Sequence, residues 1–312
     1  MAFQHCSYKV ILFNVCYLLH PIIGKILSAT VIPHGDFCYD PSLVNYTNGS
    51  QELHAAAIEV GAYINSLKPD YIFLTTPHGL ALTTDYAFYQ NSNGSGFALI
   101  GGDLHNASFP EYKVYLDTSL APAVIESILA LLDNVPNISG LSAFADTEAM
   151  ALRWGEVVPL SFLRDTTSNN FTKTMIMSMP TKRYTDSEGM VPELLSLGTT
   201  IGLYLESLTE SVSVIISSDL AHTHIASGPY GYSPTSEPFD LACGLWAKTL
   251  EPEPLLVVAK SLVGKALSCG FTGLVFLHGL LTSIPVQWTP KLYANYHPTY
   301  YGMLVADFRR NS

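Results

Sequence analysis

Charged side chains are scarce in this chain of 312 residues, since Asp, Glu, Lys and Arg make up only 13% of it. The balance is acidic, with 26 Asp and Glu against 15 Lys and Arg and a formal net charge of -11. The longest basic runs are the pairs Lys182-Arg183 and Arg309-Arg310. Affinity for nucleic acid rests on clustered Lys and Arg, so the sequence argues against a nucleic-acid partner.

Signatures of the common nucleotide-dependent and serine-dependent enzymes are also missing. No Gly-x-Ser-x-Gly, P-loop or Gly-x-Gly-x-x-Gly sequence occurs, which disfavours a serine hydrolase, an NTPase and a dinucleotide enzyme. The chain has no repeat of fixed period, and its 19 prolines and 22 glycines are not pooled into a linker. With 48% hydrophobic residues it can bury one large core. We therefore expect a single domain.

The first 29 residues differ in character from the rest. Residues 10–19 are almost wholly apolar, follow Lys9 and lead to the small residues Ser28 and Ala29. These features predict a signal peptide, whereas Pro21 and the polar residues around it disfavour a membrane-spanning helix. The alternatives are a short uncleaved anchor in a membrane and a buried element of the domain. The domain itself is then expected over residues 30–312.

Six Asn-x-Ser/Thr sequences, more than composition alone would give, also favour secretion. They begin at Asn45, Asn48, Asn93, Asn106, Asn137 and Asn170. The predicted location is therefore the secretory pathway, with glycosylation of the protein, and the alternative is the cytoplasm.

Cysteine is sparse, and the five residues present are too few for a disulfide framework in a chain of this length. Cys6 and Cys16 would be removed with a signal peptide. The remaining three are Cys38, Cys243 and Cys269. An odd number leaves at least one thiol free, bound to a ligand or paired with another chain.

Apolar periodicity predicts alternating strands and helices. The clearest helix spans about 51–67, with Ser50 as its N-cap and Pro69 after its end. Other helices are expected at 121–132, 192–207, 236–249 and 254–267 and after Gly270, and strands at 30–33, 71–75, 113–116, 173–179, 212–217, 286–296 and 302–307. Residues 85–102 are interpreted as a polar, Gly-rich excursion. The pattern predicts an α/β fold with a mostly parallel central sheet flanked by helices.

A polar segment with a histidine follows three of the predicted strands, where open α/β sheets bind ligands. Imidazole is the commonest metal ligand and the usual acid/base group. One such histidine alone would be read as a hydrogen-bonded loop residue, but the repeated placement favours a shared pocket. The segments are Pro33-His34-Gly35-Asp36, Thr76-Pro77-His78-Gly79 and Ser217-Ser218-Asp219-Leu220-Ala221-His222.

A fourth segment, Ser268-Cys269-Gly270-Phe271-Thr272-Gly273, precedes an apolar helix. A helix N-terminus favours the thiolate form of a nearby cysteine. The alternative is a buried structural cysteine beside a glycine turn.

As an ordered set these segments resemble the class III extradiol dioxygenases (LigB-like) and the MEMO superfamily to which they are related. The resemblance runs from about residue 30 to residue 308 and includes residues 295–303, Asn-Tyr-His-Pro-Thr-Tyr-Tyr-Gly-Met. In the dioxygenases, the first two histidines hold ferrous iron together with a glutamate, and the later histidine acts as acid and base. The resemblance implies that His34 and His78 are metal ligands and that His222 is catalytic. Asp219 is interpreted as a partner that orients a histidine.

The third ligand departs from the dioxygenase pattern, because the corresponding segment contains Cys269 where a glutamate is expected. In this respect the chain looks more like MEMO proteins, in which a Cys-Gly element supplies a cysteine to the site. A thiolate is a softer ligand than a carboxylate and widens the expected metals from Fe(II) to Zn or Cu. Asp36 and Glu52 are secondary candidates for a carboxylate ligand.

Three functions follow as hypotheses. The leading one is a non-haem Fe(II) extradiol dioxygenase-like oxidoreductase acting on a catechol-type aromatic with O2, with His222 as the base for the phenolic proton. The alternatives are a MEMO-like metal-binding or interaction protein without ring cleavage, and a zinc hydrolase. His224 and His297 are further pocket candidates, the other histidines are read as structural, and the oligomeric state is left open.

Overall fold

The computed structural model describes residues 26–41, 49–101, 111–143, 148–163 and 172–311. The first 25 residues of the expected leader, with Cys6 and Cys16, lie outside the described residues. Strand β1 (Ile26–Ile32) is largely buried and begins within the segment assigned to the leader. The domain therefore begins no later than Ile26, because four of the seven residues of this strand lie in the segment assigned to the leader.

The main sheet has eight strands in the order β10-β11-β1-β9-β2-β8-β3-β6. In that order they are β10 (Trp288–Tyr296), β11 (Met303–Arg310), β1, β9 (Val212–Ser217), β2 (Tyr71–Thr76), β8 (Lys173–Ser178), β3 (Tyr86–Tyr89) and β6 (Ile138–Leu141). The four central strands are parallel, whereas β10, β11 and β1 pair antiparallel and so do β8 and β3. The sheet is thus mixed rather than mostly parallel. Only six residues join β10 to β11, and so short a connection requires antiparallel pairing.

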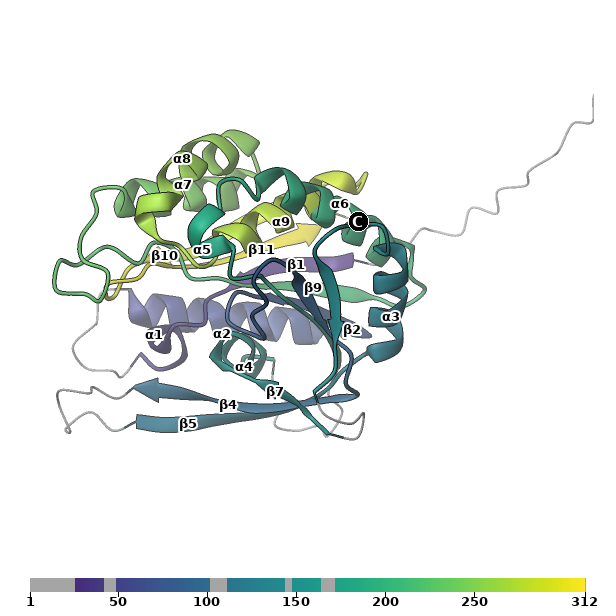
Figure 1. Ribbon diagram of the computed structural model, residues 1–312. Coiled ribbons are helices and arrows are strands. Elements are labelled where there is room, and N and C mark those ends of the chain that lie inside the picture. Colours follow the sequence, from purple (N-terminus) through teal and green to yellow (C-terminus); the bar gives the residue numbers. More distant parts are fainter. Residues whose placement is uncertain (1–25, 42–48, 102–110, 144–147, 164–171, 312) are drawn as a thin grey trace, which may run out of the picture.

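Helices cover both faces of this sheet (Figure 1). Those below it in the view are α1 (Asp36–Tyr39), α2 (Ser50–Leu67) and α4 (Trp154–Ser161). Those above are α5 (Arg183–Asp186), α6 (Val191–Ser207), α7 (Ser236–Thr249), α8 (Lys260–Ala266) and α9 (Phe271–Ser283), while η1 (Pro254–Ala259) leads into α8 and α3 (Pro122–Leu131) lies near one end of the sheet. The helix predicted at 236–249 is confirmed to the residue, and α2 begins one residue early because Gly49 rather than Ser50 is its N-cap. No helix in the described segments is long and apolar enough to cross a membrane.

A second sheet has three strands in the order β5 (Glu111–Ser119), β4 (Asn93–Gly101) and β7 (Met150–Leu152). The prediction of an irregular excursion over 85–102 is wrong, since this stretch forms β3 and β4. The glycines that suggested a loop allow close strand packing instead. A Cβ at Gly96 would overlap the carbonyl oxygen of Leu152 on β7. Glycine is therefore needed inside this strand.

Two hydrophobic cores lie on opposite faces of the main sheet. Phe73 and Val214 belong to the core under α6 and α9, and their chain neighbours Leu74 and Ile215 belong to the core over α2 and α4. All four side chains are fully buried. Successive residues of a strand point to opposite faces, so a strand buried on both faces has to be apolar throughout. This explains the continuous apolar runs in the central strands.

Close packing of α6 on α9 gives a test of the upper core. A Cβ at Gly198 would overlap the carbonyl oxygen of Phe276, and backbone cannot yield as a side chain can. We expect Gly198→Ala to lower the free energy of unfolding by about 1–3 kcal/mol, measured by urea denaturation. Gly264→Ala is the control, because α8 has open space at that position and alanine there is expected to be neutral or stabilising. Equal stability of Gly198→Ala and the wild type would contradict the packing.

Candidate metal centre

The three histidine segments meet at one edge of the sheet because their strands are parallel neighbours. His34 follows β1, His78 follows β2, and the segment with Asp219 and His222 follows β9, which lies between those two strands. Parallel strands present their carboxyl ends at the same edge. Cys269 reaches this edge from the segment before α9, where the backbone N–H of Gly270 donates to the carbonyl oxygen of Asp219 (3.0 Å). The predicted convergence is therefore present in the structure.

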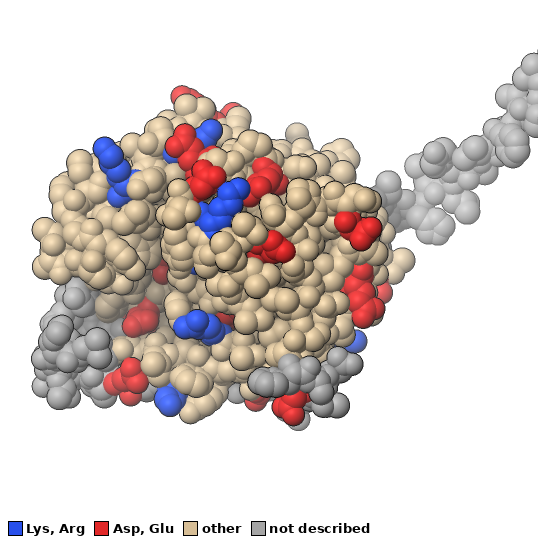
Figure 2. Space-filling model, in the orientation of Figure 1, with Lys and Arg blue, Asp and Glu red and all other residues tan. Residues whose placement is uncertain are grey.

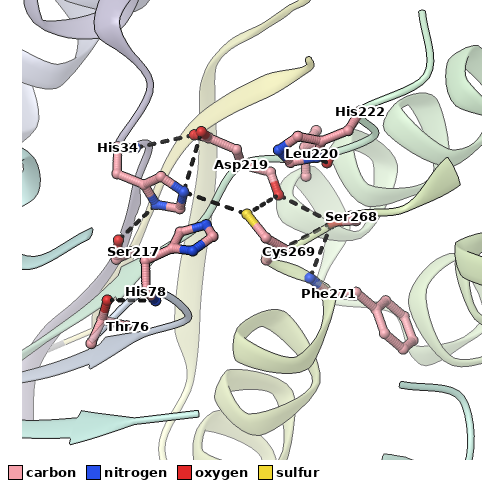
Figure 3. Close-up of polar contacts among 11 residues, drawn as sticks. His34, Thr76, His78, Ser217, Asp219, Leu220, His222, Ser268, Cys269 and Phe271 are labelled. Atoms are coloured by element: carbon pink, nitrogen blue, oxygen red, sulfur yellow. Dashed lines mark hydrogen bonds and ion pairs between the residues drawn. The ribbon is translucent and has the colours of Figure 1, made fainter. Parts of the chain in front are cut away.

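His34, His78 and Cys269 form a group with the dimensions of a mononuclear metal site. Each offers one ligand atom, and these atoms all lie within 4.8 Å of one another. Sγ of Cys269 is 3.4 Å from Nε2 of His34, and the two imidazoles are nearly perpendicular with centroids 4.8 Å apart. Figure 3 shows the two rings and the thiol directed toward one another. Ligand atoms around a tetrahedral ion are about 3.5 Å apart, so a small movement would close the group on a metal.

The His34 ring is oriented by residues at the end of β9. Its Nδ1 lies 2.8 Å from Oγ of Ser217, which leaves Nε2 for the thiol side. The backbone N–H of His34 donates to Oδ1 of Asp219 (3.1 Å), and Oδ2 of the same carboxyl group is 3.3 Å from Nε2. A ligating histidine normally has a hydrogen-bond partner for the ring nitrogen that does not bind the metal, and Ser217 takes that place at Nδ1 of His34. Asp219 thus contacts a histidine, as the sequence predicted, and Ser217 is a partner that the sequence analysis did not identify.

Helix α4 packs against His78 through its first two residues, Trp154 and Gly155. The sequence analysis did not predict this helix. The Trp154 ring lies 5.0 Å from the His78 ring at an angle of 31°. A Cβ on Gly155 would lie 3.0 Å from Cβ of His78. The backbone N–H of His78 donates to Oγ1 of Thr76 (3.2 Å) at the end of β2. These contacts fix the backbone that carries the second imidazole.

Burial keeps the groups of the centre neutral when no cation is bound. It is the first cause that lowers the pKa of His34 well below its usual value and that of His78 to about 3. Burial also raises the pKa of the Cys269 thiol, and it raises the pKa of Asp219 to about 8. Two neutral imidazoles have lone pairs available for a metal, and a bound cation would displace the thiol proton. The donor set therefore fits a soft or borderline divalent ion.

His222 lies along the same edge but outside the ligand group. Its Nδ1 is 2.9 Å from the carbonyl oxygen of Leu220, which favours the tautomer with the proton on Nδ1, and the Leu267 carbonyl also interacts with the ring. Burial is the first cause that lowers its pKa to about 4. The rings of three tyrosines surround it at centroid distances of 5.9–6.1 Å: Tyr230, Tyr300 and Tyr301. A neutral base within an aromatic wall suits a flat, proton-donating ligand.

The other candidate residues lie elsewhere. Asp36 accepts from the backbone N–H of Gly101 (3.3 Å), and Glu52 is exposed on α2, so neither belongs to the ligand group. His224, a further pocket candidate, is engaged away from the ligand group, because its Nε2 is 2.7 Å from Oδ2 of Asp240.

The ring of His224 stacks on that of His297 at 4.0 Å and 5°, with His297 3.3 Å from Glu237. With Glu237 these histidines form a second group whose ligand atoms lie within 4.8 Å of one another. As placed, the parallel rings direct their lone pairs alongside each other rather than at one ion, and Nε2 of His224 is engaged by Asp240.

The cysteines in the described part of the chain are free, and Cys38 and Cys243 are fully buried away from the ligand group. No disulfide occupies Cys269 here, so its thiol is available to the centre. On the face drawn in Figure 2, Lys and Arg are dispersed among Asp and Glu rather than gathered into one basic patch.

Comparisons with known proteins place the chain by fold alone. No family model matches it. It is 26% identical over 220 residues to Protein CA_C1420 of Clostridium acetobutylicum, a match that covers 68% of this chain and 43% of that protein. The chain thus matches less than half the length of this curated relative. The crystal structure of uncharacterized protein JW3007 from Escherichia coli K12 covers 90% of this chain and 99% of its own with a TM-score of 0.54 at 13% identity.

Glu156 on α4 provides a test of the packing behind His78. It is fully buried, and its carboxyl oxygens accept from the Tyr89 hydroxyl (2.8 Å) and the Arg153 backbone N–H (3.0 Å). Burial raises its pKa from 4.5 to about 7. The folded state therefore retains a proton that the unfolded state has lost, so this group makes stability fall as pH rises from about 4.5 to 7.

We expect Glu156→Gln to remove that part of the pH dependence. As pH rises towards 7, the free energy of unfolding of the variant should therefore increase relative to that of the wild type by up to about 1.4 kcal/mol per pH unit. The measurement is urea unfolding of metal-free protein between pH 5 and 8. Glu59→Gln, at an exposed carboxylate, is the control and should keep the wild-type slope. An unchanged slope in Glu156→Gln would show that this carboxyl is not buried as described.

Proposed function

We propose that the chain is a metal-binding protein of the LigB-like and MEMO kind, in which His34, His78 and Cys269 hold one divalent metal ion. The observation that supports it is the convergence of two imidazoles and a thiol, all within 4.8 Å, at the carboxyl edge of three parallel strands. Such edges are the usual ligand sites of α/β sheets. A cysteine in place of a carboxylate favours iron, copper or zinc over magnesium or calcium.

The MEMO-like role is preferred because no carboxylate takes the place of the thiol. Asp219 lies beside His34, but its Oδ1 accepts from the His34 backbone N–H and its Oδ2 contacts the His34 ring. Asp36 and Glu52 lie outside the group. A His2Cys donor set supports metal storage, transfer or redox chemistry without requiring ring cleavage.

A second candidate, an extradiol dioxygenase acting on a catechol-type aromatic with O2, is favoured by one specific observation. His222 is a neutral base enclosed by Tyr230, Tyr300 and Tyr301. Nε2 of His222 would accept a proton from a substrate hydroxyl, and the tyrosine rings would hold the aromatic ring. A bound metal would supply diol chelation and the redox chemistry with O2.

Metal content tests the proposal. We expect about one iron, copper or zinc per wild-type chain after purification, and at least about a tenfold loss of affinity in His34→Ala, His78→Ala and Cys269→Ser, read by mass spectrometry of the metals and by chelator competition. His54→Ala is the control, because it removes an imidazole that belongs to neither group of possible metal ligands among the described residues. Wild-type protein that takes up no metal under anaerobic loading would contradict the proposal.

Oxygen uptake by the Fe(II)-loaded protein with a panel of catechols separates the two candidates. Uptake with a ring-opened product, lost in His222→Ala, would favour the dioxygenase. Stoichiometric metal without uptake would favour the MEMO-like role, and zinc with ester or amide turnover would favour a hydrolase.

Entry into the secretory pathway belongs to the same proposal. It is supported by the apolar segment at residues 10–19 and by the six Asn-x-Ser/Thr sequences. Asn93 is exposed at the start of β4 and Asn137 is half-buried, while the other four lie outside the described residues. We expect glycosidase treatment of the native protein to lower its mass, with Asn93→Gln reducing the shift. A mass unaffected by the enzyme, with residues 1–25 retained, would favour the cytoplasm.

A further inference from the structure

Arg183, the first residue of α5, is a buried cation without an anionic partner. Its exposed fraction is 4%. Nη1 donates to the carbonyl oxygen of Pro180 (3.0 Å) and Nη2 to the hydroxyl of Tyr184 (2.6 Å), but Nε is buried and has no hydrogen-bond partner. None of the ion pairs among the described residues includes Arg183. The Tyr184 ring, 4.0 Å from the guanidinium, offsets only part of the cost of burying this charge.

The fold holds this arginine beside the metal centre. Strand β8, which leads to it, pairs with β2, whose end carries His78. The backbone N–H of Thr181 donates to the carbonyl oxygen of Leu82 (2.8 Å), and that of Lys182 donates to Thr83 (2.9 Å). These bonds tie the segment before α5 to the chain just after His78.

The charge of Arg183 is felt by all three ligands. After burial, it is among the causes that lower the pKa of His34 and of His78. Burial raises the pKa of the Cys269 thiol, and the same guanidinium lowers it. Burial is the first cause that lowers the pKa of Arg183, and Tyr184 and Cys269 act against it.

We propose that the metal centre takes a small organic anion, a carboxylate or a phenolate, and that Arg183 is the counter-ion that selects it. This inference rests on the proposed metal-binding function and names the class of ligand. The guanidinium of Arg183 is buried, has no ion-pair partner among the described residues and leaves its Nε–H without an acceptor, so it places one unbalanced positive charge beside the centre. A monovalent anion balances that charge. The free Nε–H is a donor of the kind that carboxylates and phenolates accept.

The experiment uses the Co(II)-loaded full chain with azide as an anionic probe and imidazole as a neutral probe, both followed through the cobalt absorption bands. Arg183→Met is expected to weaken azide at least about tenfold and to leave imidazole within about twofold. Lys182→Met is the matched control, because it removes the same charge from the adjacent, more exposed residue. Arg183→Gln replaces the Met variant if that variant does not fold.

The outcomes separate this inference from the proposed function. Cobalt content is measured first, and a wild type without cobalt would overturn the metal-binding function itself. Cobalt-loaded protein whose azide affinity is unchanged in the Arg183 variants, or falls equally for imidazole, would overturn the counter-ion role alone. An equal loss of azide affinity in Lys182→Met would also overturn it, since the effect would then be that of net charge.

Discussion

Parallel pairing of β1, β9 and β2 is the constraint on which the rest of the site depends. The three strands end together, so histidines that are far apart in sequence face one pocket without any long loop to bring them there. The middle strand, β9, ends at Ser217, whose hydroxyl contacts Nδ1 of His34, and Asp219 two residues later contacts the backbone N–H and Nε2 of the same histidine. A shift of β9 by one residue relative to β1 would turn the side chain at its end to the other face of the sheet, away from His34. Register and site geometry are therefore the same property of this fold.

Burial gives the centre its chemical character. Two imidazoles and a thiol are removed from water, and each is neutral because its charged form is poorly solvated there. Such a group is stable without a cation, yet it becomes a strong ligand set when a cation supplies the missing charge. The buried guanidinium of Arg183 adds a second positive charge beside a bound cation, and we propose that an anionic ligand offsets it.

The sequence predicted the regular helices and the apolar strands well, since α7 and β9 follow directly from periodicity, and the turns after the strands indicated the site. Three features escaped it for identifiable reasons. Glycines in β4 suggested a loop, although they serve close packing against Leu152. Helix α4, which supports His78, is short and contains Pro159. Arg183 was read only as part of a short basic pair, because burial of a single charge leaves no pattern in one sequence.

Strand β1 also sets the order in which the molecule can be completed. Its partners are β9 and β11, about 180 and 280 residues further along the chain. During synthesis, this apolar segment precedes both partners and stays unpaired in the sheet until they have been made. Contacts of such long range slow folding and leave strand edges open to aggregation. Protection of residues 26–32 until β9 and β11 have been made would therefore favour the yield of folded protein.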